Sequence, residues 1–438
     1  MKIGRQLLAI VLSLILLAAT VGCNSKAKSE PEEETITVLV SDQGTSDLGI
    51  HMNSLMDETK QLVESNNQGL HVNVVRVPSE QYEDKIKELS PDIFWYMPSQ
   101  LNDLEKQNKL MDLNLLNSEG LDLTQYFAPK LLDMTTVDGK LLGITLAAYD
   151  MSIGYSKEWF DKANLPYPTS DWTWDDFVST AIQLKQANAA GMDSAYGAII
   201  PLFPEFVESI AMGKGSGFLS PDGTTASGYW DGEPAVDTVK WLQNLIRDGV
   251  IPKDTSDMQS ITDSLGLTTG MLLSISPLFS DLANSGKPIA TVSMPHFTDG
   301  ERVSAPYITV LGISSGSKYP HAAMKYIQAL TLEDNNITRQ AFQMGLSVSK
   351  AVFDKIGDKV APYIVQEYND LQFAQKRSFM KSMAWNDILM QYSNEWYSLF
   401  ATDEDPAPKL TDMAKRIDIT LAEAAQKRAE ASESASPQ

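Results

Sequence analysis

Asp138-Gly139-Lys140-Leu141-Leu142-Gly143-Ile144-Thr145-Leu146-Ala147-Ala148-Tyr149-Asp150-Met151-Ser152-Ile153-Gly154-Tyr155 is the stretch that decides the fold. Its first two residues form a dipeptide typical of a tight turn. The apolar runs at 141–146 and 151–155 are typical of strands. Tyr149 and Asp150, an aromatic residue beside a carboxylate, lie between the two runs. The stretch therefore predicts two extended segments joined by a short polar connection.

Two helices are predicted directly after this stretch. Trp159 and Phe160 open a short helix that we expect to end at Pro166. Thr173 is a suitable N-cap, and Asp176 three residues later completes a variant of the capping box. The helix that follows is expected to extend to about residue 190.

The chain before this stretch alternates strand and helix patterns. Strand-like runs at 35–40, 70–74 and 92–95 are separated by helical patterns at 48–63 and 80–89. This alternation predicts parallel βαβ units in a doubly wound sheet. Ligands of such sheets bind beyond the carboxyl ends of the strands. Asp42 and Trp95 stand at two of these ends, so both are candidate ligand-binding residues.

Length and charge restrict the class of protein. With 438 residues the chain is too long for one ordinary core, so two lobes are expected. Its formal charge is −22, from 57 acidic against 35 basic residues. This balance argues against nucleic acid as a partner, and against electrostatic binding to anionic lipid. The surface charge is expected to serve solubility.

The first residues have the pattern of an export signal. Lys2 and Arg5 precede an apolar run at 7–17, and small residues lead to Cys23, the single cysteine. A cysteine directly after Gly22 resembles a bacterial lipobox, which predicts lipidation of Cys23 and a polar tether at 24–34. The alternative is a plain secretory signal with an incidental cysteine.

Three motifs that suggest catalysis or cofactor binding lack the context they require. Residues 312–316 match G-x-S-x-G, but the next helix is delayed and no acid-then-histidine pair follows. The glycine-rich run at 213–217 lacks the spacing and the helix of a phosphate loop. The four histidines are scattered, and no cysteine cluster exists. We therefore expect no catalytic residues, no metal and no cofactor.

Aromatic residues at strand ends and turns form a more informative pattern. An aromatic face covers the apolar face of a pyranose ring, while Asp and Asn side chains bind its hydroxyl groups. Core packing is the alternative for each of these residues, and it is favoured for Trp174 and for Trp241. The aromatic residues at such positions are Trp95, Tyr96, Tyr149, Trp172, Trp174, Trp230, Tyr307 and Trp385.

The chain resembles the family 1 extracellular solute-binding proteins, the sugar-binding lipoproteins of bacterial ABC importers, over nearly its whole mature length. Five blocks in the family's order carry the resemblance: 91–95 is similar to the P-D-(I/V)-x-x strand, 138–144 to D-G-K-x-Y-G-(I/V), 155–165 to Y-N-K-D-L-F-x-K-A-G-L, 173–177 to T-W-(D/E)-E-(F/L), and 317–323 to S-K-(N/H)-P-E-x-A.

The resemblance implies an α/β fold with two lobes of the periplasmic-binding-protein type, class II, each a mostly parallel sheet flanked by helices, with a hinge between them. The implied organisation is a signal peptide at 1–22, a tether at 23–34, a first lobe at 35–148 plus 300–347, a second lobe at 149–299 plus 348–430, and a frayed tail at 431–438. The family's ligand-contacting positions fall on Trp95, Tyr149 with Asp150, Ser276 and Trp385.

The implied function is capture of a carbohydrate, with an oligosaccharide favoured, and its delivery to an ABC transporter permease. The protein would act as a lipid-anchored monomer on the extracellular face of the membrane, with no nucleic acid as partner. Two alternatives stay open. One is a sensor that signals to a membrane receptor. The other is a secreted glycosidase, which requires two carboxylates roughly 5–10 Å apart across the cleft.

Overall fold

The computed structural model describes residues 33–434 except 43–46, 118–122, 128, 189, 193, 276–277, 280–281, 283–285 and 345–347. The expected signal peptide, Cys23 and most of the tether therefore lie outside the described residues. Within the described part, no helix is both long enough and apolar enough to cross a membrane.

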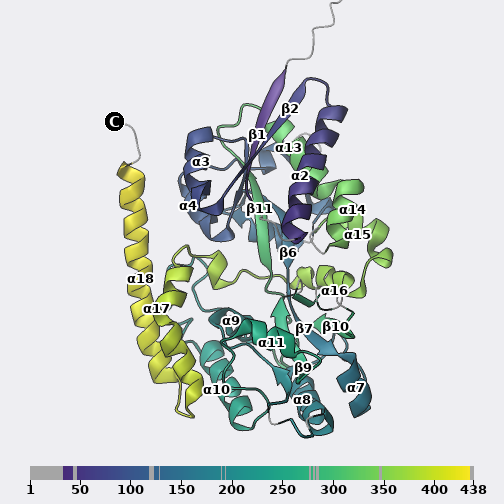
Figure 1. The fold of residues 1–438 in the computed structure, drawn as a ribbon. Coiled ribbons are helices and arrows are strands. Elements are labelled where there is room, and N and C mark those ends of the chain that lie inside the picture. Colours follow the sequence, from purple (N-terminus) through teal and green to yellow (C-terminus); the bar gives the residue numbers. More distant parts are fainter. Residues whose placement is uncertain are drawn as a thin grey trace, which may run out of the picture.

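Two separate sheets organise the molecule, one in each half of Figure 1. We call each sheet with its helices a lobe. The first sheet has the order β2 (Leu70–Val77), β1 (Glu34–Ser41), β3 (Ile93–Tyr96), β11 (Tyr307–Ile313) and β6 (Ile144–Tyr149). The second has the order β10 (Ile289–Ser293), β7 (Met151–Ser156), β9 (Thr269–Ile275) and β8 (Tyr196–Ile199).

The two-lobed α/β fold is confirmed, but the sheets are mixed rather than mostly parallel. Strand β1 is parallel to β2 and β3, and β8 is parallel to β9. The pairs β3–β11, β11–β6, β10–β7 and β7–β9 are antiparallel. The reason is the double crossing of the chain. Strand β6 leads directly into β7, and β10 leads back to β11, so the outgoing and returning strands lie side by side in opposite directions.

The decisive stretch folds largely as its sequence indicates. Asp138 and Gly139 join β4 (Thr136–Val137) to β5 (Lys140–Leu141), with φ of 49° and 79°. Positive φ at both positions is typical of a two-residue hairpin turn. Asp150 is the single residue between β6 and β7. The chain therefore changes sheet, and lobe, at this residue.

Helices cover both faces of the first sheet. Ser349, the N-cap of α15, donates its hydroxyl to the Leu332 carbonyl, and α15 packs on α14. Residues 348–356 therefore lie with the first lobe, and the lobe boundary expected at 347 does not coincide with a change of sheet. The helices of this lobe are α2 (Asp47–Asn66), α3 (Tyr82–Leu89), α4 (Leu101–Lys106), α5 (Asn114–Asn117), α6 (Pro129–Met134), α13 (Pro320–Ile327), α14 (Asn336–Gln343) and α15 (Lys350–Ile356).

The second lobe carries the predicted capped helices. Thr173 donates its backbone N–H to Asp176 at 2.9 Å, and Asp176 donates its own to the Thr173 hydroxyl at 3.2 Å, which confirms the capping-box variant. Helix α7 ends at Asn164 in the left-handed conformation, two residues before the expected Pro166. The helices are α7 (Lys157–Ala163), α8 (Trp174–Asn188), α9 (Pro204–Met212), α10 (Glu233–Arg247), α11 (Met258–Ser264) and α17 (Trp385–Ser398).

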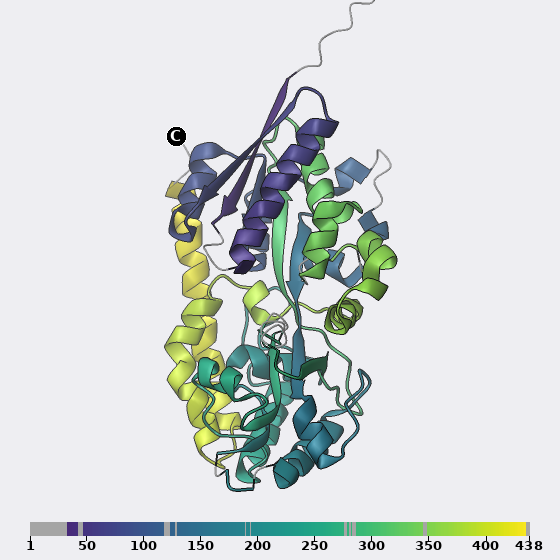
Figure 2. The same cartoon turned by 45° about the vertical axis from the view of Figure 1, so that its right-hand side comes forward.

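Two helices connect the lobes. Helix α16 (Pro362–Asp370) packs against β10 close to the level at which the chain crosses (Figure 1). Helix α18 (Ala407–Ser434) runs beside α17 and continues alongside part of the first lobe, as both views show (Figure 2). Near its end, Arg428 pairs with Asp103 of α4 at 3.0 Å. The helix extends to Ser434, beyond residue 430, where a frayed tail was expected.

Candidate functional site

Four of the seven expected binding residues lie at one edge of the first sheet. Strands β1, β3 and β6 run in the same direction, and β11 runs in the opposite one. The ends of the first three strands and the start of β11 therefore lie at the same edge, from which the chain crosses to the second lobe. Asp42 follows β1, Trp95 is in β3, Tyr149 ends β6 and Tyr307 begins β11.

Tyr149 and Tyr307 form a cross-strand pair at this edge. They are directly opposite in the antiparallel register of β6 and β11, so their side chains are on the same face. Both side chains are half-buried. Burial raises the pKa of Tyr149 to about 12, so its hydroxyl is protonated at neutral pH. The pair offers two aromatic rings and two hydroxyl groups.

Trp95 lies on the same face, further along β3. It is opposite Leu311, four residues after Tyr307 in β11, and such residues share a face. Its ring is half-buried and meets the Tyr82 ring edge-on at 5.9 Å between centroids. Its indole Nε1 is buried and has no hydrogen-bond partner among the described residues. An unused buried donor of this kind is suited to a ligand oxygen.

Tyr82 holds the ends of β1 and β3 apart beside Trp95. Its hydroxyl donates to the Leu39 carbonyl and accepts the backbone N–H of Trp95, both at 2.8 Å. A tyrosine hydroxyl thus takes the place of a strand-to-strand hydrogen bond. Asp42, exposed just beyond β1, accepts a weak hydrogen bond from Asn53 at 3.4 Å. Its place at a strand end agrees with the prediction.

Asp150, expected as a ligand-binding residue, is buried at the crossing. Its Oδ1 accepts the backbone N–H of Met151 at 2.7 Å and that of Ala305 at 3.2 Å. Ala305 belongs to the returning segment, so this carboxyl joins the two crossings. Burial, and next the negative charge of Asp370, raise the pKa of Asp150 to about 7. Asp150 therefore ties the two connections between the sheets together, directly after Tyr149.

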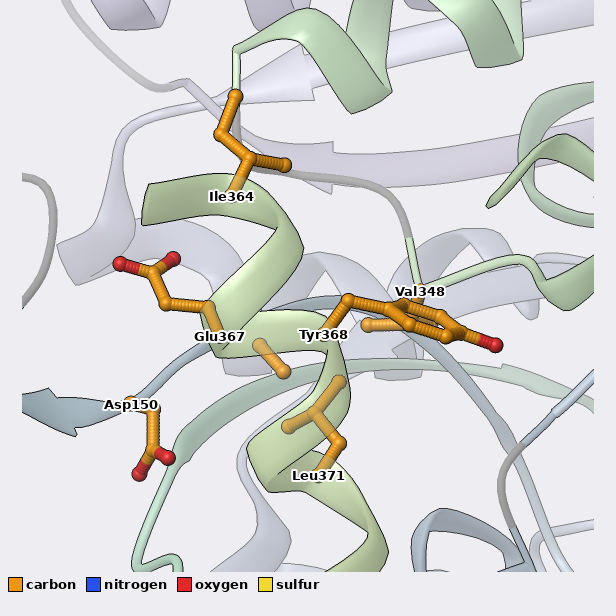
Figure 3. A pocket seen from close by; sticks show the side chains of 7 residues that line it. Asp150, Val348, Ile364, Glu367, Tyr368 and Leu371 are labelled. Carbon is orange, nitrogen blue, oxygen red and sulfur yellow. The ribbon is translucent and has the colours of Figure 1, made fainter. Parts of the chain in front are cut away.

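A second buried acid lies near Asp150. Asp370, at the end of α16, accepts hydrogen bonds from Ser293 at 3.0 Å and from Arg302 at 2.9 Å. Burial raises the pKa of Asp370, and Arg302 opposes that change. Figure 3 shows Asp150 beside α16, which carries Glu367. The cavity between them has room for about one water molecule, so it is too small for a sugar.

Trp385 is placed in the core of the second lobe. It is 2 % exposed, and its ring is 6.0 Å from that of Trp230. Its indole Nε1 donates to Glu205 of α9 at 3.2 Å. The structure therefore shows packing for Trp385, and the acceptor of its hydrogen bond, Glu205, also lies beside Tyr307. Ser276 lies outside the described residues.

Arg377 is a residue that the sequence analysis missed. Its side chain is fully buried, with the guanidinium carbon 3.8 Å from the centre of the Tyr307 ring and 4.8 Å from that of Phe379. None of its three side-chain nitrogens has a hydrogen-bond partner in the described structure. The sequence does not predict its burial, because two basic residues in a polar segment, Lys376 and Arg377, are typical of a solvent-exposed loop.

These residues together are suited to non-covalent binding. They supply aromatic faces, hydroxyl groups, an indole N–H and a guanidinium group next to the passage between lobes. Among the described residues, no three His, Cys, Asp or Glu side chains come together in a way that could hold a metal ion. Aromatic faces with a few placed polar groups are the residue types that line ligand sites.

A family comparison identifies the class of protein. Residues 60–371 match the model of the bacterial extracellular solute-binding proteins, which covers well over half of the chain. The chain belongs to this family. As a solute-binding protein it is assigned to the class that the sequence resemblance implied, and that expectation is confirmed.

Solved structures show the same fold as this solute-binding protein. A family 1 extracellular solute-binding protein from Alicyclobacillus acidocaldarius aligns with a TM-score of 0.72, 18% identity, 89% of this chain and 99% of that one. The sugar-binding protein MalE from Xanthomonas citri aligns with a TM-score of 0.72 and 16% identity, over 90% of this chain and 98% of that one. A substrate-binding protein from Listeria monocytogenes, solved with cycloalternan, aligns with a TM-score of 0.64 and 18% identity, over 89% of this chain and 100% of that one.

One curated relative matches a short part of the solute-binding protein. It is an uncharacterized ABC transporter extracellular-binding protein from Pyrococcus horikoshii, 37% identical over 86 residues. The match covers 19% of this chain and 18% of the relative, so the chain spans less than a fifth of that protein's length. This match shows a local similarity only. The assignment to the solute-binding family rests on the family model.

Proposed function

We propose that the protein captures an oligosaccharide between its two lobes and delivers it to the permease of an ABC importer. The observation that carries this proposal is the pair of Tyr149 and Tyr307 at the crossing, with Trp95 on the same face. Aromatic faces beside unused polar groups are what a pyranose ring requires, since its C–H face is apolar and its rim is hydroxylated. Asp42 contributes a carboxylate acceptor at the same edge.

Structural relatives support the carbohydrate class. The Listeria monocytogenes protein was solved with cycloalternan, and the Xanthomonas citri protein is described as sugar-binding. A cyclo/maltodextrin-binding protein in complex with maltotetraose also shares the fold, with a TM-score of 0.71. Membership of the family supports extracellular binding of a solute. The aromatic residues at the edge of the first sheet support a sugar as that solute.

The remaining parts of the proposal concern location and mode of action. The protein acts as a monomer on the extracellular face, held by a lipid on Cys23 through the polar segment at 24–34. It binds without making or breaking bonds, and closure of the lobes about Asp150 presents the ligand to the permease. Tyr149, Tyr307, Trp95 and Asp42 bind ligand, whereas Asp150 supports the hinge. Ser276 is also part of the proposed site, and Trp385 acts on it indirectly, because it donates to Glu205, which lies beside Tyr307.

A sugar panel tests the proposal. Purified protein is heated in the presence of maltotetraose, cellotetraose, xylotetraose and acidic oligosaccharides, and tryptophan fluorescence is followed in parallel. A ligand of the native state raises the melting temperature as its concentration rises. The proposal fails if no carbohydrate changes either signal. Incubation of a binding sugar with the protein, followed by chromatography, should return it uncleaved.

A further inference from the structure

We propose that the ligand carries a carboxylate, as in an oligosaccharide containing uronic acid, and that the guanidinium group of Arg377 binds it. This inference rests on the proposed function, because it names the class of sugar that the same site takes. It starts from a buried positive charge that lies over aromatic rings and has no paired acid among the described residues.

Arg377 has no ion-pair partner in the described structure, although two acids lie on the adjacent helix α9. Glu205 accepts the indole N–H of Trp385. Glu208 accepts the backbone N–H of Phe218 at 2.9 Å and the backbone N–H and hydroxyl of Ser378. Both acids are thus engaged by other donors, and Arg377 meets the Tyr307 side chain without a hydrogen bond of good geometry to either acid.

An unpaired buried charge is strongly unfavourable, because the loss of hydration is not offset by hydrogen bonds or an opposite charge. Hydrophobic residues of similar size would be more stable at such a position. A guanidinium group without a paired acid at this position favours a ligand that brings the negative charge with it. Functional groups commonly lower stability in this way.

The position of Arg377 places such a partner at the binding edge. Its guanidinium group lies over the ring of Tyr307, which is opposite Tyr149. An anion bound to its nitrogens would therefore lie next to the aromatic pair proposed to cover a pyranose ring. Because the side chain is fully buried, the ligand reaches it when the lobes separate.

The surrounding segment adds positive charge in a chain whose formal charge is −22. Lys376 and Lys381 lie on either side of Arg377 in sequence and are half-buried. Burial lowers the pKa of both, and the charge of Lys381 further lowers that of Lys376, while nearby Asp133, Glu208 and Asp222 oppose these changes. Three basic residues therefore lie within six positions of one another in the segment that carries Arg377.

A guanidinium group binds a carboxylate better than it binds an anion without two parallel acceptor oxygens. The planar guanidinium group presents parallel N–H donors that match the two oxygens of a carboxylate. Sulfated sugars share the negative charge, and inorganic phosphate shares it without the sugar. The experiment therefore includes these probes as separate arms.

Calorimetric titration compares trigalacturonate with galactotriose of the same linkage, which differ in their carboxylates. Sulfated galactotriose and inorganic phosphate are titrated in the same buffer. We expect trigalacturonate to bind at least about tenfold more tightly than galactotriose, with weaker binding at high salt. Equal or tighter binding of galactotriose overturns this inference and leaves the proposed function standing. Tighter binding of sulfated galactotriose or phosphate overturns the assignment to a carboxylate. If neither these sugars nor the neutral panel binds, the proposed function fails as well.

Three variants test the role of Arg377. Arg377→Met should abolish the preference for trigalacturonate and leave the melting temperature of the unliganded protein equal or higher. Arg377→Lys should keep part of the preference. Arg247→Met, which removes an exposed arginine paired with Asp248, is the matched control and should keep all of it. An unchanged preference in Arg377→Met overturns the proposal. A fall in its melting temperature would also do so, because the guanidinium group would then stabilise the fold itself.

Discussion

Tyr149 is directly opposite Tyr307 in the antiparallel pairing of β6 and β11, one residue before the chain leaves the first lobe. The same pairing places both rings on one face, and Arg377 covers the ring of Tyr307. The proposed binding edge is therefore built from residues far apart in the sequence that meet where the lobes meet.

Removal of one ring of this pair should weaken sugar binding without unfolding the protein. We expect Tyr149→Ala to raise the dissociation constant of the best oligosaccharide from the panel roughly two- to tenfold, since an aromatic contact contributes about 0.5–1.5 kcal/mol. Tyr149→Phe keeps the ring and should lose less. Calorimetric titration measures both variants, and circular dichroism checks their fold. Normal binding by Tyr149→Ala would remove Tyr149 from the site.

The buried carboxyl of Asp150 should make stability depend on pH. Its pKa is about 7 in the folded protein and near 3.8 in the unfolded chain, so the folded state binds the proton more tightly. Its stabilising contribution is therefore fully present below about pH 4 and is lost as the pH rises through about 7. The loss is at most about 4 kcal/mol, since a tenfold change in protonation corresponds to about 1.4 kcal/mol.

Asp150→Asn isolates this contribution, because an amide oxygen can accept the same two backbone N–H groups but does not ionise. Urea unfolding at pH 4, 6 and 8 should show the variant gaining stability relative to the wild type as the pH rises. A difference that stays constant across these pH values would contradict the assignment.

Glu208 should be important for stability. It is fully buried and accepts hydrogen bonds from Phe218 and Ser378, so it fixes the segment that carries Arg377 to α9. Glu208→Ala leaves these buried donors without an acceptor and should lower the free energy of unfolding by about 2–4 kcal/mol. Denaturant unfolding gives the value. Glu80→Ala, at an exposed glutamate, should change it by less than about 0.5 kcal/mol.

Gly197 of β8 should not tolerate a side chain. A Cβ atom at this position would lie 1.7 Å from the carbonyl oxygen of Ala181 in α8, so strand and helix would have to move apart. We expect Gly197→Ala to destabilise the protein by about 1–3 kcal/mol or more. At Gly316 the nearest atom would be 3.8 Å away, an ordinary contact, so Gly316→Ala is the control. Equal melting temperatures for the two variants would contradict the packing argument.

Local signals predicted the elements around the crossing well. Asp138-Gly139 indicated the turn, and Thr173 and Asp176 indicated the cap. Of the pair expected between two strands, Asp150 lies there, whereas Tyr149 is the last residue of β6. Each of these features depends on residues within a few positions of one another. The sheets were harder to predict, because strand direction depends on the returning segment, which pairs with strands more than a hundred residues away.

Burial of individual polar and aromatic residues could not be predicted in the same way. Trp385 packs near Trp230, 155 residues earlier in the chain, and only this tertiary contact shows that its ring is in the core. Arg377 is buried because Tyr307 and Phe379 cover it. The residues next to it in the sequence do not predict this burial. Asp150 was predicted at the crossing, but its bond to Ala305 required the structure.

The single-residue link at Asp150 also determines how the site behaves when the lobes turn. In any rotation, atoms near the axis are displaced far less than atoms at the rim. Tyr149 is the immediate neighbour of Asp150, and Tyr307 is opposite Tyr149. The spacing of the two rings should therefore be almost the same in open and closed forms. A sugar would meet a ready-made platform on entry, and closure would add only the more distant contacts.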